Sequence, residues 1–259
     1  MGIRVTAILN LKGGVGKTTT VINMAYVLAK IHGKRVLVLD ADSQCNTTEF
    51  FGAWSDSANM ATLLRMPHLN DFPGGIFGVR RTAFDNIDIL PASDELMELD
   101  LSKVEQGTAN ANALRELVKT ASNDYDYVLI DCPPAFNAAS AAALIAANDV
   151  IIPIKLDAFS LRGMTNLLRQ IQLMRKINPH LSLVGCLPTM WYAAPEIVAA
   201  ERQLRGAQLP VLHRIRRSDK VDAMTFAQEP LCVFSPRSAP AVDYRKFVAE
   251  EYLGGVDHV

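Results

Sequence analysis

A run of glycines and lysines near the N-terminus constrains this chain more than any other feature. The apolar segment Val5–Leu9 predicts a strand, and Lys12-Gly13-Gly14-Val15-Gly16-Lys17-Thr18-Thr19 follows it. Glycines let successive backbone N–H groups turn inward around an anion, and the helix expected next directs its positive dipole end to the same point. The run therefore predicts a phosphate-binding loop between a strand and a helix.

This loop departs from the usual pattern at its first position. The usual pattern is G-x-x-x-x-G-K. In this chain Gly16 and Lys17 match the second glycine and the lysine, and Leu11 occupies the position of the first glycine. Lys17 is expected to reach the β- and γ-phosphates of a nucleotide, and the hydroxyl of Thr18 to bind Mg²⁺. A second lysine, Lys12, stands at the mouth of the loop. We therefore predict a variant loop that binds a nucleoside triphosphate with magnesium.

Apolar strands alternate with helical patterns along the rest of the chain. Strands are predicted at 36–39, 87–90, 128–130, 150–154 and 183–187, and helices at 138–147 and 161–177. Wholly apolar strands are typical of a parallel sheet that is covered on both faces. The order predicts an α/β fold with a doubly wound, mostly parallel sheet and helices on both faces. Residues 52–90 are predicted to be loops with one short helix and the strand at 87–90, and residues 1–259 to form one domain.

Two of these strands end in aspartates. Asp40 follows the strand at 36–39 and Asp131 follows the strand at 128–130. Both are expected at the carboxyl edge of the sheet, where ligands bind in such folds. Because Mg²⁺ prefers oxygen ligands and keeps several waters, Thr18, Asp40 and Asp131 are the candidate metal-site residues. Asp42 lies in the next loop and is the candidate for orienting the water that attacks the γ-phosphate.

Charge and cysteine usage exclude other classes. The net charge is −1, so affinity for nucleic acid has to come from a local patch. The four cysteines are scattered and form no C-x-x-C pair, which is typical of a reduced interior. The longest apolar run, at 138–147, is shorter than the ~20 residues that cross a bilayer. We expect a cytoplasmic protein that does not bind membranes.

One short segment concentrates positive charge. Residues 213–220 contain Arg214, Arg216, Arg217 and Lys220. Exposed cations of this kind bind nucleic-acid phosphates in a salt-dependent way. No helix-turn-helix, zinc-finger or RNA-binding pattern is present, so any binding is expected to be independent of sequence. From charge alone, a solvated face with a few ion pairs remains the alternative.

Four segments together resemble the ParA/Soj ATPases, which drive plasmid and chromosome partition. They belong to the deviant Walker A group, with MinD and the nitrogenase iron protein. The matching segments lie at 12–19, 40–44, 89–92 and 125–134, and similarity extends from residue 3 to about residue 250. No Asn-Lys-x-Asp box is present, so adenine is expected in place of guanine.

The resemblance implies roles for the matched residues. Lys12 corresponds to the signature lysine that reaches a partner subunit's ATP, Lys17 to the phosphate-loop lysine, and Thr18 to the magnesium threonine. Asp42 corresponds to the hydrolytic aspartate and Asp131 to the aspartate of the second switch. Catalytic roles are thus implied for Lys12, Lys17 and Asp42. The implied nucleotide contacts are Lys12, Gly13, Gly14, Val15, Gly16, Lys17, Thr18, Thr19, Thr189 and Met190.

The activity that the resemblance implies is ATP-dependent DNA partition. ATP and Mg²⁺ are expected to close a sandwich homodimer, which binds double-stranded DNA non-specifically through Arg216, Arg217 and Lys220. A ParB-like partner is expected to stimulate hydrolysis and release, and the protein to be associated with the nucleoid. The chain also departs from the family. Ser43 replaces a proline that fixes φ, which loosens the loop after Asp42, and Arg216 replaces the proline of the family's Ile-Pro-Arg-Asn-x-Arg segment.

Other members of the group provide the competing interpretations. A MinD-like membrane ATPase needs a basic amphipathic C-terminal helix, and residues 242–252 have mixed charges and a modest apolar side. An iron–sulfur reductase needs paired cysteines at a dimer axis, whereas Cys132 is expected to be a buried thiol at a strand end. A related tyrosine kinase is disfavoured because the chain has no tyrosine-rich tail.

Overall fold

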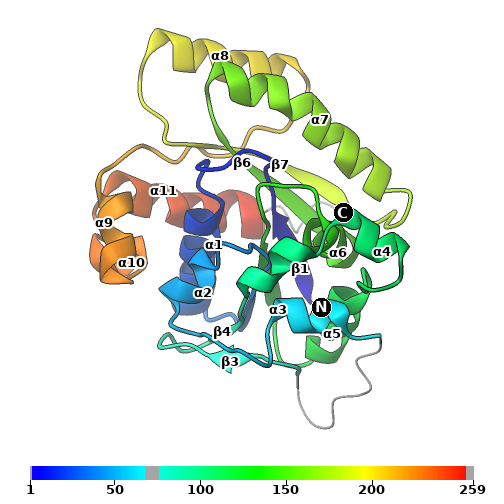
Figure 1. Cartoon of the computed structure of the whole chain (residues 1–259). Coiled ribbons are helices and arrows are strands. Elements are labelled where there is room, and N and C mark those ends of the chain that lie inside the picture. The colour runs from blue at the N-terminus through cyan, green and yellow to red at the C-terminus, as the bar shows by residue number, and fades with distance from the viewer. Residues whose placement is uncertain (1, 68–75, 255–259) are drawn as a thin grey trace.

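A seven-stranded sheet forms the centre of the computed structural model, which describes residues 2–67 and 76–254 (Figure 1). The strand order is β3-β4-β2-β5-β1-β6-β7, and β3 is antiparallel to β4 whereas the other neighbours pair in parallel. The strands are β1 Arg4–Ile8, β2 Val36–Asp40, β3 Arg80–Arg81, β4 Ile87–Leu90, β5 Tyr127–Asp131, β6 Asp149–Lys155 and β7 Ser182–Thr189. Parallel pairing brings the carboxyl ends of six strands to one edge.

Helices connect the strands and cover the sheet. They are α1 Lys17–Tyr26, α2 Asn46–Phe50, α3 Met60–Arg65, α4 Leu101–Glu105, α5 Ala113–Ala121, α6 Ala138–Ala146, α7 Ala158–Met174, α8 Pro195–Gly206, α9 Lys220–Ala227, α10 Leu231–Phe234 and α11 Ala239–Lys246. π-Helical turns at Val27–Ile31 and Phe247–Leu253 extend α1 and α11, and a 3₁₀ turn spans Asp94–Glu98.

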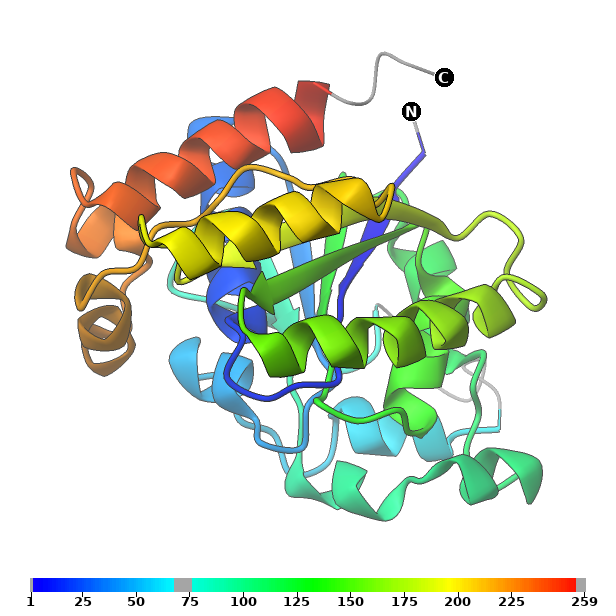
Figure 2. The ribbon, with the colours of Figure 1, turned by 90° about the horizontal axis from the view of Figure 1, so that it is seen from above.

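Two hydrophobic cores lie on opposite faces of the sheet. In β5, Val128 and Ile130 join a core built with α3, α5, α6 and α7, whereas Leu129 joins a core built with α1, α9, α10 and α11. Successive side chains of a strand point to opposite faces, so one apolar strand supplies both cores. Figure 2 shows the strands lying between α11 and α7. The predicted doubly wound α/β fold is confirmed.

The predicted strands are also confirmed, with small shifts at their ends. The helix expected at 161–177 is α7, which begins at Ala158 and ends at Met174. The short helix expected within 52–90 is α3. The loop predicted around Pro73 falls partly in 68–75, outside the described residues. The antiparallel strand β3 was not predicted, because two exposed arginines carry no apolar pattern.

The last described turn completes the second core. Phe247, Val248 and Tyr252 are fully buried, and the Tyr252 hydroxyl lies 2.6 Å from the Thr6 hydroxyl in β1. The guanidinium of Arg4 donates a 2.6 Å hydrogen bond to the carbonyl of Tyr252. The apolar side of the C-terminal helix is therefore buried in the second core. Among the described residues, no helix is long and apolar enough to cross a membrane.

Candidate nucleotide-binding site

The glycine-rich loop connects β1 to α1 at the carboxyl edge of the sheet. Gly14 and Gly16 have φ values of 68° and 85°, a left-handed conformation that glycine adopts without a Cβ clash. The Thr189 hydroxyl at the end of β7 donates a 2.8 Å hydrogen bond to the carbonyl of Val15. The loop is thus held by a strand outside its own β-α unit.

The two lysines of the loop lie in different environments. Lys17 is 6 % exposed, and its Nζ donates a 3.4 Å hydrogen bond to the carbonyl of Lys12, so its amine lies across the loop. The Nζ of Lys12 instead lies 2.7 and 2.9 Å from the two carboxylate oxygens of Asp157, just beyond β6. Lys17 therefore belongs to its own loop, and Lys12 is directed away from it.

Asp131 is fully buried at the end of β5. Its Oδ2 accepts hydrogen bonds from the hydroxyls of Thr18 (2.7 Å) and Thr47 (2.6 Å), whereas its buried Oδ1 finds no hydrogen-bond partner among the described residues. Burial raises the pKa of Asp131 to about 6, although the two hydroxyls and the charge of Lys17 lower it. A buried carboxylate oxygen without a partner beside a threonine hydroxyl fits a hydrated Mg²⁺, because buried polar atoms need partners.

Asp40 occupies the neighbouring position on β2, in register with Asp131. Its Oδ2 accepts hydrogen bonds from the backbone N–H and the hydroxyl of Thr48 (2.8 and 2.7 Å), and its Oδ1 accepts from the N–H of Asp42 (3.2 Å). Burial, and after it the charge of Asp131, raises the pKa of Asp40 to about 8. Both oxygens of Asp40 thus have partners inside the chain. A metal role for Asp40 therefore stays a prediction. The carboxylate oxygen that lacks a partner is Oδ1 of Asp131.

Asp42 begins a tight loop between β2 and α2. Its Oδ1 accepts a 3.0 Å hydrogen bond from the N–H of Gln44, and its carbonyl accepts one from the N–H of Cys45. Cys45 has a φ of 56°, and α2 starts at the next residue. Asp42 is 6 % exposed, so its carboxylate lies at the site without being open to bulk water. Its predicted hydrolytic role is untested.

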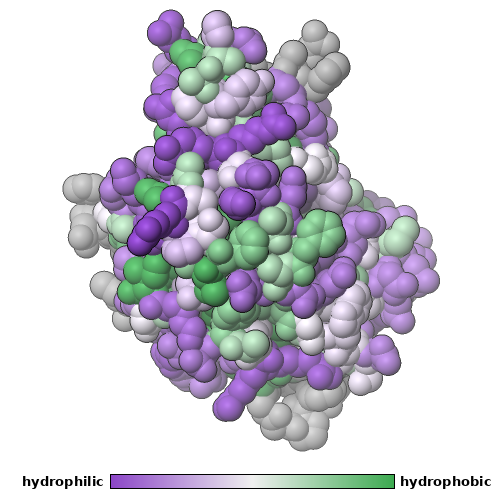
Figure 3. Space-filling model, turned by 90° about the vertical axis from the view of Figure 1, so that its left-hand side faces the viewer, coloured by the Kyte–Doolittle hydropathy of each residue, from purple (hydrophilic) through white to green (hydrophobic). Residues whose placement is uncertain are grey.

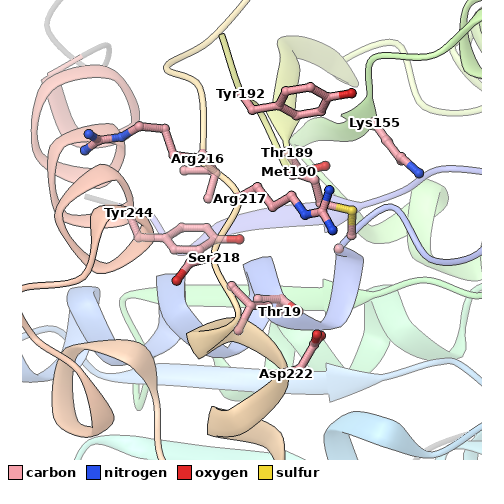
Figure 4. Close-up of a pocket in the computed structure, with 13 residues that line it drawn as sticks. Thr19, Lys155, Thr189, Met190, Tyr192, Arg216, Arg217, Ser218, Asp222 and Tyr244 are labelled. Atoms are coloured by element: carbon pink, nitrogen blue, oxygen red, sulfur yellow. The ribbon is translucent and has the colours of Figure 1, made fainter. Parts of the chain in front are cut away.

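A cavity of about 310 Å³ lies beside the loop (Figure 4). The predicted contacts Gly16, Thr19, Thr189 and Met190 line it. The other lining residues were not predicted as nucleotide contacts. They come from β6, the segment after β7, α9 and α11: Lys155, Tyr192, Ile215, Arg216, Arg217, Ser218, Val221, Asp222 and Tyr244. No local motif marks these residues as nucleotide contacts, because only the fold brings them together. The cavity has the size of a nucleoside-binding pocket and adjoins the phosphate loop.

The basic segment before α9 is divided among several partners. The guanidinium of Arg216 forms hydrogen bonds of 2.7 to 3.2 Å with the Asp243 carboxylate, whose residue is 2 % exposed. The guanidinium of Arg214 stacks over the Trp191 ring at 4.2 Å. Figure 4 shows Arg217 pointing into the cavity and Arg216 pointing away from it. Of the three predicted DNA contacts, Arg216 is thus ion-paired within the chain, and Lys220 is exposed at the start of α9.

Known proteins are similar to this chain in both sequence and fold. The model of the AAA domain family matches residues 3–183. The sporulation initiation inhibitor protein Soj of Bacillus subtilis is 30% identical over 97% of this chain and 99% of its own length. The chromosome-partitioning ATPase Soj of Thermus thermophilus is 32% identical over 98% of this chain and 97% of its own length.

A solved structure gives the same result for the fold. The structure named cobyrinic acid a,c-diamide synthase from Mycobacterium smegmatis, with bound ADP and magnesium, is 30% identical. It superposes with a TM-score of 0.78 over 98% of this chain and 96% of its own. With the variant phosphate loop, two strand-end aspartates and full-length similarity to both Soj proteins, this chain belongs to the ParA/Soj family of chromosome-partitioning ATPases.

Proposed function

We propose that this chain partitions DNA by forming a sandwich homodimer around Mg-ATP and releasing DNA after hydrolysis. The nucleotide phosphates lie in the glycine-rich loop, and the base lies in the cavity lined by Met190 and Tyr192. Thr18 and Asp131 hold Mg²⁺, which supplies neutralising charge to the β- and γ-phosphates when bound. The proposal places the protein on the nucleoid in the cytoplasm.

The main support for the proposal is that Lys12 and Lys17 lie in different environments. A lysine that serves its own phosphate loop is expected to lie over that loop, as Lys17 does. Lys12 comes from the same loop, yet its partly exposed side chain pairs with Asp157, which lies after β6. A partly exposed cation at the mouth of a phosphate site suits phosphate oxygens that arrive on a second subunit. This arrangement supports a dimer in which each Lys12 reaches the partner's nucleotide.

The chain's own groups then account for hydrolysis. Lys17 and the loop N–H groups bind phosphate oxygens, and Lys12 of the partner subunit adds positive charge where negative charge develops. The carboxylate of Asp42 orients the attacking water. Phosphoryl transfer requires mainly positioning and charge stabilisation, so this set of residues is sufficient for slow turnover. A ParB-like partner accelerates the step in this proposal.

DNA binding rests on fewer residues than the basic segment contains. Asp243 already balances the charge of Arg216, whereas Lys220 is exposed on α9. The side of the molecule that carries α2, α9 and α10 has hydrophobic side chains in its middle, with hydrophilic ones around them (Figure 3). Because Lys220 is exposed, we assign DNA contact to Lys220, doubled in the dimer. We leave out Arg216, which is ion-paired with Asp243, and Arg217, which points into the nucleotide cavity.

A MinD-like membrane role is the second candidate. It needs an amphipathic C-terminal helix whose apolar side is available to lipid. In this chain Phe247, Val248 and Tyr252 on that side are fully buried against the sheet. This packing favours DNA over lipid as the surface that the ATP-bound form occupies. Flotation of the ATP-bound chain with anionic liposomes separates the two candidates.

Size-exclusion chromatography with light scattering tests the proposal. The Asp42→Ala chain with Mg-ATP is expected to elute as a dimer that retains a non-specific DNA duplex, and with ADP as a monomer that does not. Lys12→Gln in the same background is the matched control and is expected to remain monomeric. A dimer that forms equally with Lys12→Gln, or an ATP-bound chain that never self-associates, contradicts the sandwich dimer.

A further inference from the structure

Two consecutive threonines at the start of α2 bind the carboxylates of two different strands. The Thr47 hydroxyl donates a 2.6 Å hydrogen bond to Asp131 on β5, and the Thr48 hydroxyl donates a 2.7 Å hydrogen bond to Asp40 on β2. All four residues have no exposed surface. The Thr48 hydroxyl also accepts a 2.8 Å hydrogen bond from the N–H of Ala92, which follows β4. The position of α2 is therefore fixed against three strands of the sheet.

The geometry points to Thr47 as a positioning residue for ATP hydrolysis, one that holds Asp131 toward the metal and ties the Asp42 loop to it. The inference rests on the proposed role of Asp42 as the hydrolytic aspartate. Thr47 touches neither nucleotide nor metal in this assignment, and it acts through Asp131 and through the start of α2.

The two oxygens of Asp131 have different surroundings, and this difference gives Thr47 its role. Both hydroxyl donors, from Thr18 and Thr47, bind Oδ2, and Oδ1 is left as the oxygen that can accept from a metal-bound water. The hydroxyl of Thr18 is also the expected metal ligand, so its geometry changes when the metal binds. Thr47 has no such second task. Its hydrogen bond therefore keeps the carboxylate from rotating while Thr18 adjusts.

The same bond restrains the loop that carries Asp42. Only Ser43, Gln44, Cys45 and Asn46 separate Asp42 from Thr47. The N–H of Asp42 is bound to Asp40 at one end, and the Thr47 hydroxyl is bound to Asp131 at the other. Ser43 supplies no proline ring to fix φ within this loop. The hydrogen bond of Thr47 consequently takes part in holding the Asp42 carboxylate at the reacting phosphate.

Thr47→Val is the primary test, because valine keeps the branched shape and removes the donor. We expect kcat for ATP to fall about tenfold, the scale of a lost hydrogen bond to a charged group, with KM changed less than twofold. Thr47→Ser keeps the hydroxyl and is expected to restore kcat. Thr6→Val is the matched control: Thr6 is also fully buried and also makes a 2.6 Å hydroxyl contact, with Tyr252, away from the site.

A second readout does not depend on turnover. The affinity for ADP is measured by calorimetry with Mg²⁺ and again with EDTA. We expect Thr47→Val to reduce the gain in affinity from Mg²⁺ about tenfold and to leave the EDTA value unchanged, while Thr6→Val and Thr47→Ser keep the full gain. This measurement involves neither Asp42 nor DNA, so it tests Thr47 even if the partition proposal fails.

The Mg²⁺-dependent gain in ADP affinity decides whether Thr47 acts as a positioning residue. A Thr47→Val chain with the wild-type Mg²⁺ gain overturns the inference, and so does an equal loss in Thr6→Val, since that result reflects general loosening. If Thr47→Val does not fold, Thr47→Ser and Thr47→Ala are compared in its place. In that comparison, equal Mg²⁺ gains with and without the hydroxyl overturn the inference, and a gain that requires it supports the inference.

Discussion

Lys12 and Asp157 form an ion pair at the mouth of the nucleotide site, with 2.7 Å between Nζ and the nearer carboxylate oxygen. The two side chains come from the loop after β1 and the segment after β6, and they are 37% and 28% exposed. Partly exposed ion pairs contribute at most about 1 kcal/mol, because water screens them. The pair is therefore strong enough to orient Lys12 and weak enough to yield to a triphosphate.

Asp157→Asn is expected to favour the ATP-bound dimer. The substitution removes the carboxylate charge that holds Lys12, and ~1 kcal/mol corresponds to about a fivefold lower ATP concentration at half-maximal dimerisation. Light scattering across an ATP titration in the Asp42→Ala background measures the shift. The double variant with Lys12→Gln is expected to lose it. A titration unchanged by Asp157→Asn means that the ion pair does not compete with dimer formation.

Arg216→Ala is expected to destabilise the chain instead of only weakening DNA binding. It leaves the buried Asp243 carboxylate without its main cation; because the Arg216 side chain is 46% exposed and water screens the pair, the expected loss is about 1 kcal/mol. Urea unfolding at neutral pH measures the change in the free energy of unfolding. Arg237→Ala is the control, because it removes a guanidinium of the same size that forms no ion pair with Asp243. Equal stabilities for the two variants contradict a structural role for Arg216.

Lys220→Ala is expected to show the opposite behaviour. The exposed Lys220 contributes little to stability, so unfolding in urea is expected to be unchanged. If each subunit of the dimer contacts one phosphate through Lys220, the log–log slope of DNA affinity against salt falls by about 1.8 units. Fluorescence anisotropy with a labelled duplex at several salt concentrations gives the slope. An unchanged slope removes Lys220 from the DNA interface.

Asp40→Asn is expected to reduce the pH dependence of stability. The pKa of Asp40 is raised to about 8 in the folded chain, against about 3.9 when unfolded, so the folded state binds this proton more tightly. Its contribution is therefore full below pH 4 and is lost as pH rises toward 8, at about 1 kcal/mol per pH unit between pH 5 and 7. Urea unfolding in the presence of EDTA at pH 5 and at pH 7 gives the change in the free energy of unfolding per pH unit for wild type and variant. The same slope for wild type and variant contradicts the raised pKa.

Gly78→Ala is expected to lower the free energy of unfolding by about 2 kcal/mol or more. Gly78 has a φ of 66°, and a Cβ there meets the carbonyl of Ala58 at 2.9 Å and the side chain of Leu90 at 2.8 Å. Left-handed backbone and overpacking both oppose the added methyl group. Gly107→Ala is the control. Gly107 has a φ of 72° but open space where a Cβ would lie, so its loss of stability measures the cost of the left-handed backbone alone. Thermal unfolding that shows equal losses for both alanine variants contradicts the crowding.

Local features of the sequence predicted the elements and the phosphate loop because their causes are local. Apolar runs define strands, and glycine with lysine defines the loop at its own positions. The contacts that decide chemistry join distant residues: Thr47 lies 84 positions from Asp131, and Lys12 lies 145 from Asp157. Sequence proximity also grouped Arg216 with Arg217 and Lys220, although Asp243, 27 positions away, takes its charge. Only the three-dimensional arrangement assigns such partners.

The contact between Arg4 and Tyr252 has a practical meaning for anyone who shortens this protein. The carbonyl of Tyr252 accepts a hydrogen bond from Arg4 of β1, and β1 leads directly into the glycine-rich loop. A stop codon after Lys246 therefore removes no dispensable tail. Such a product is expected to lose nucleotide affinity, although every residue around the phosphates is still encoded.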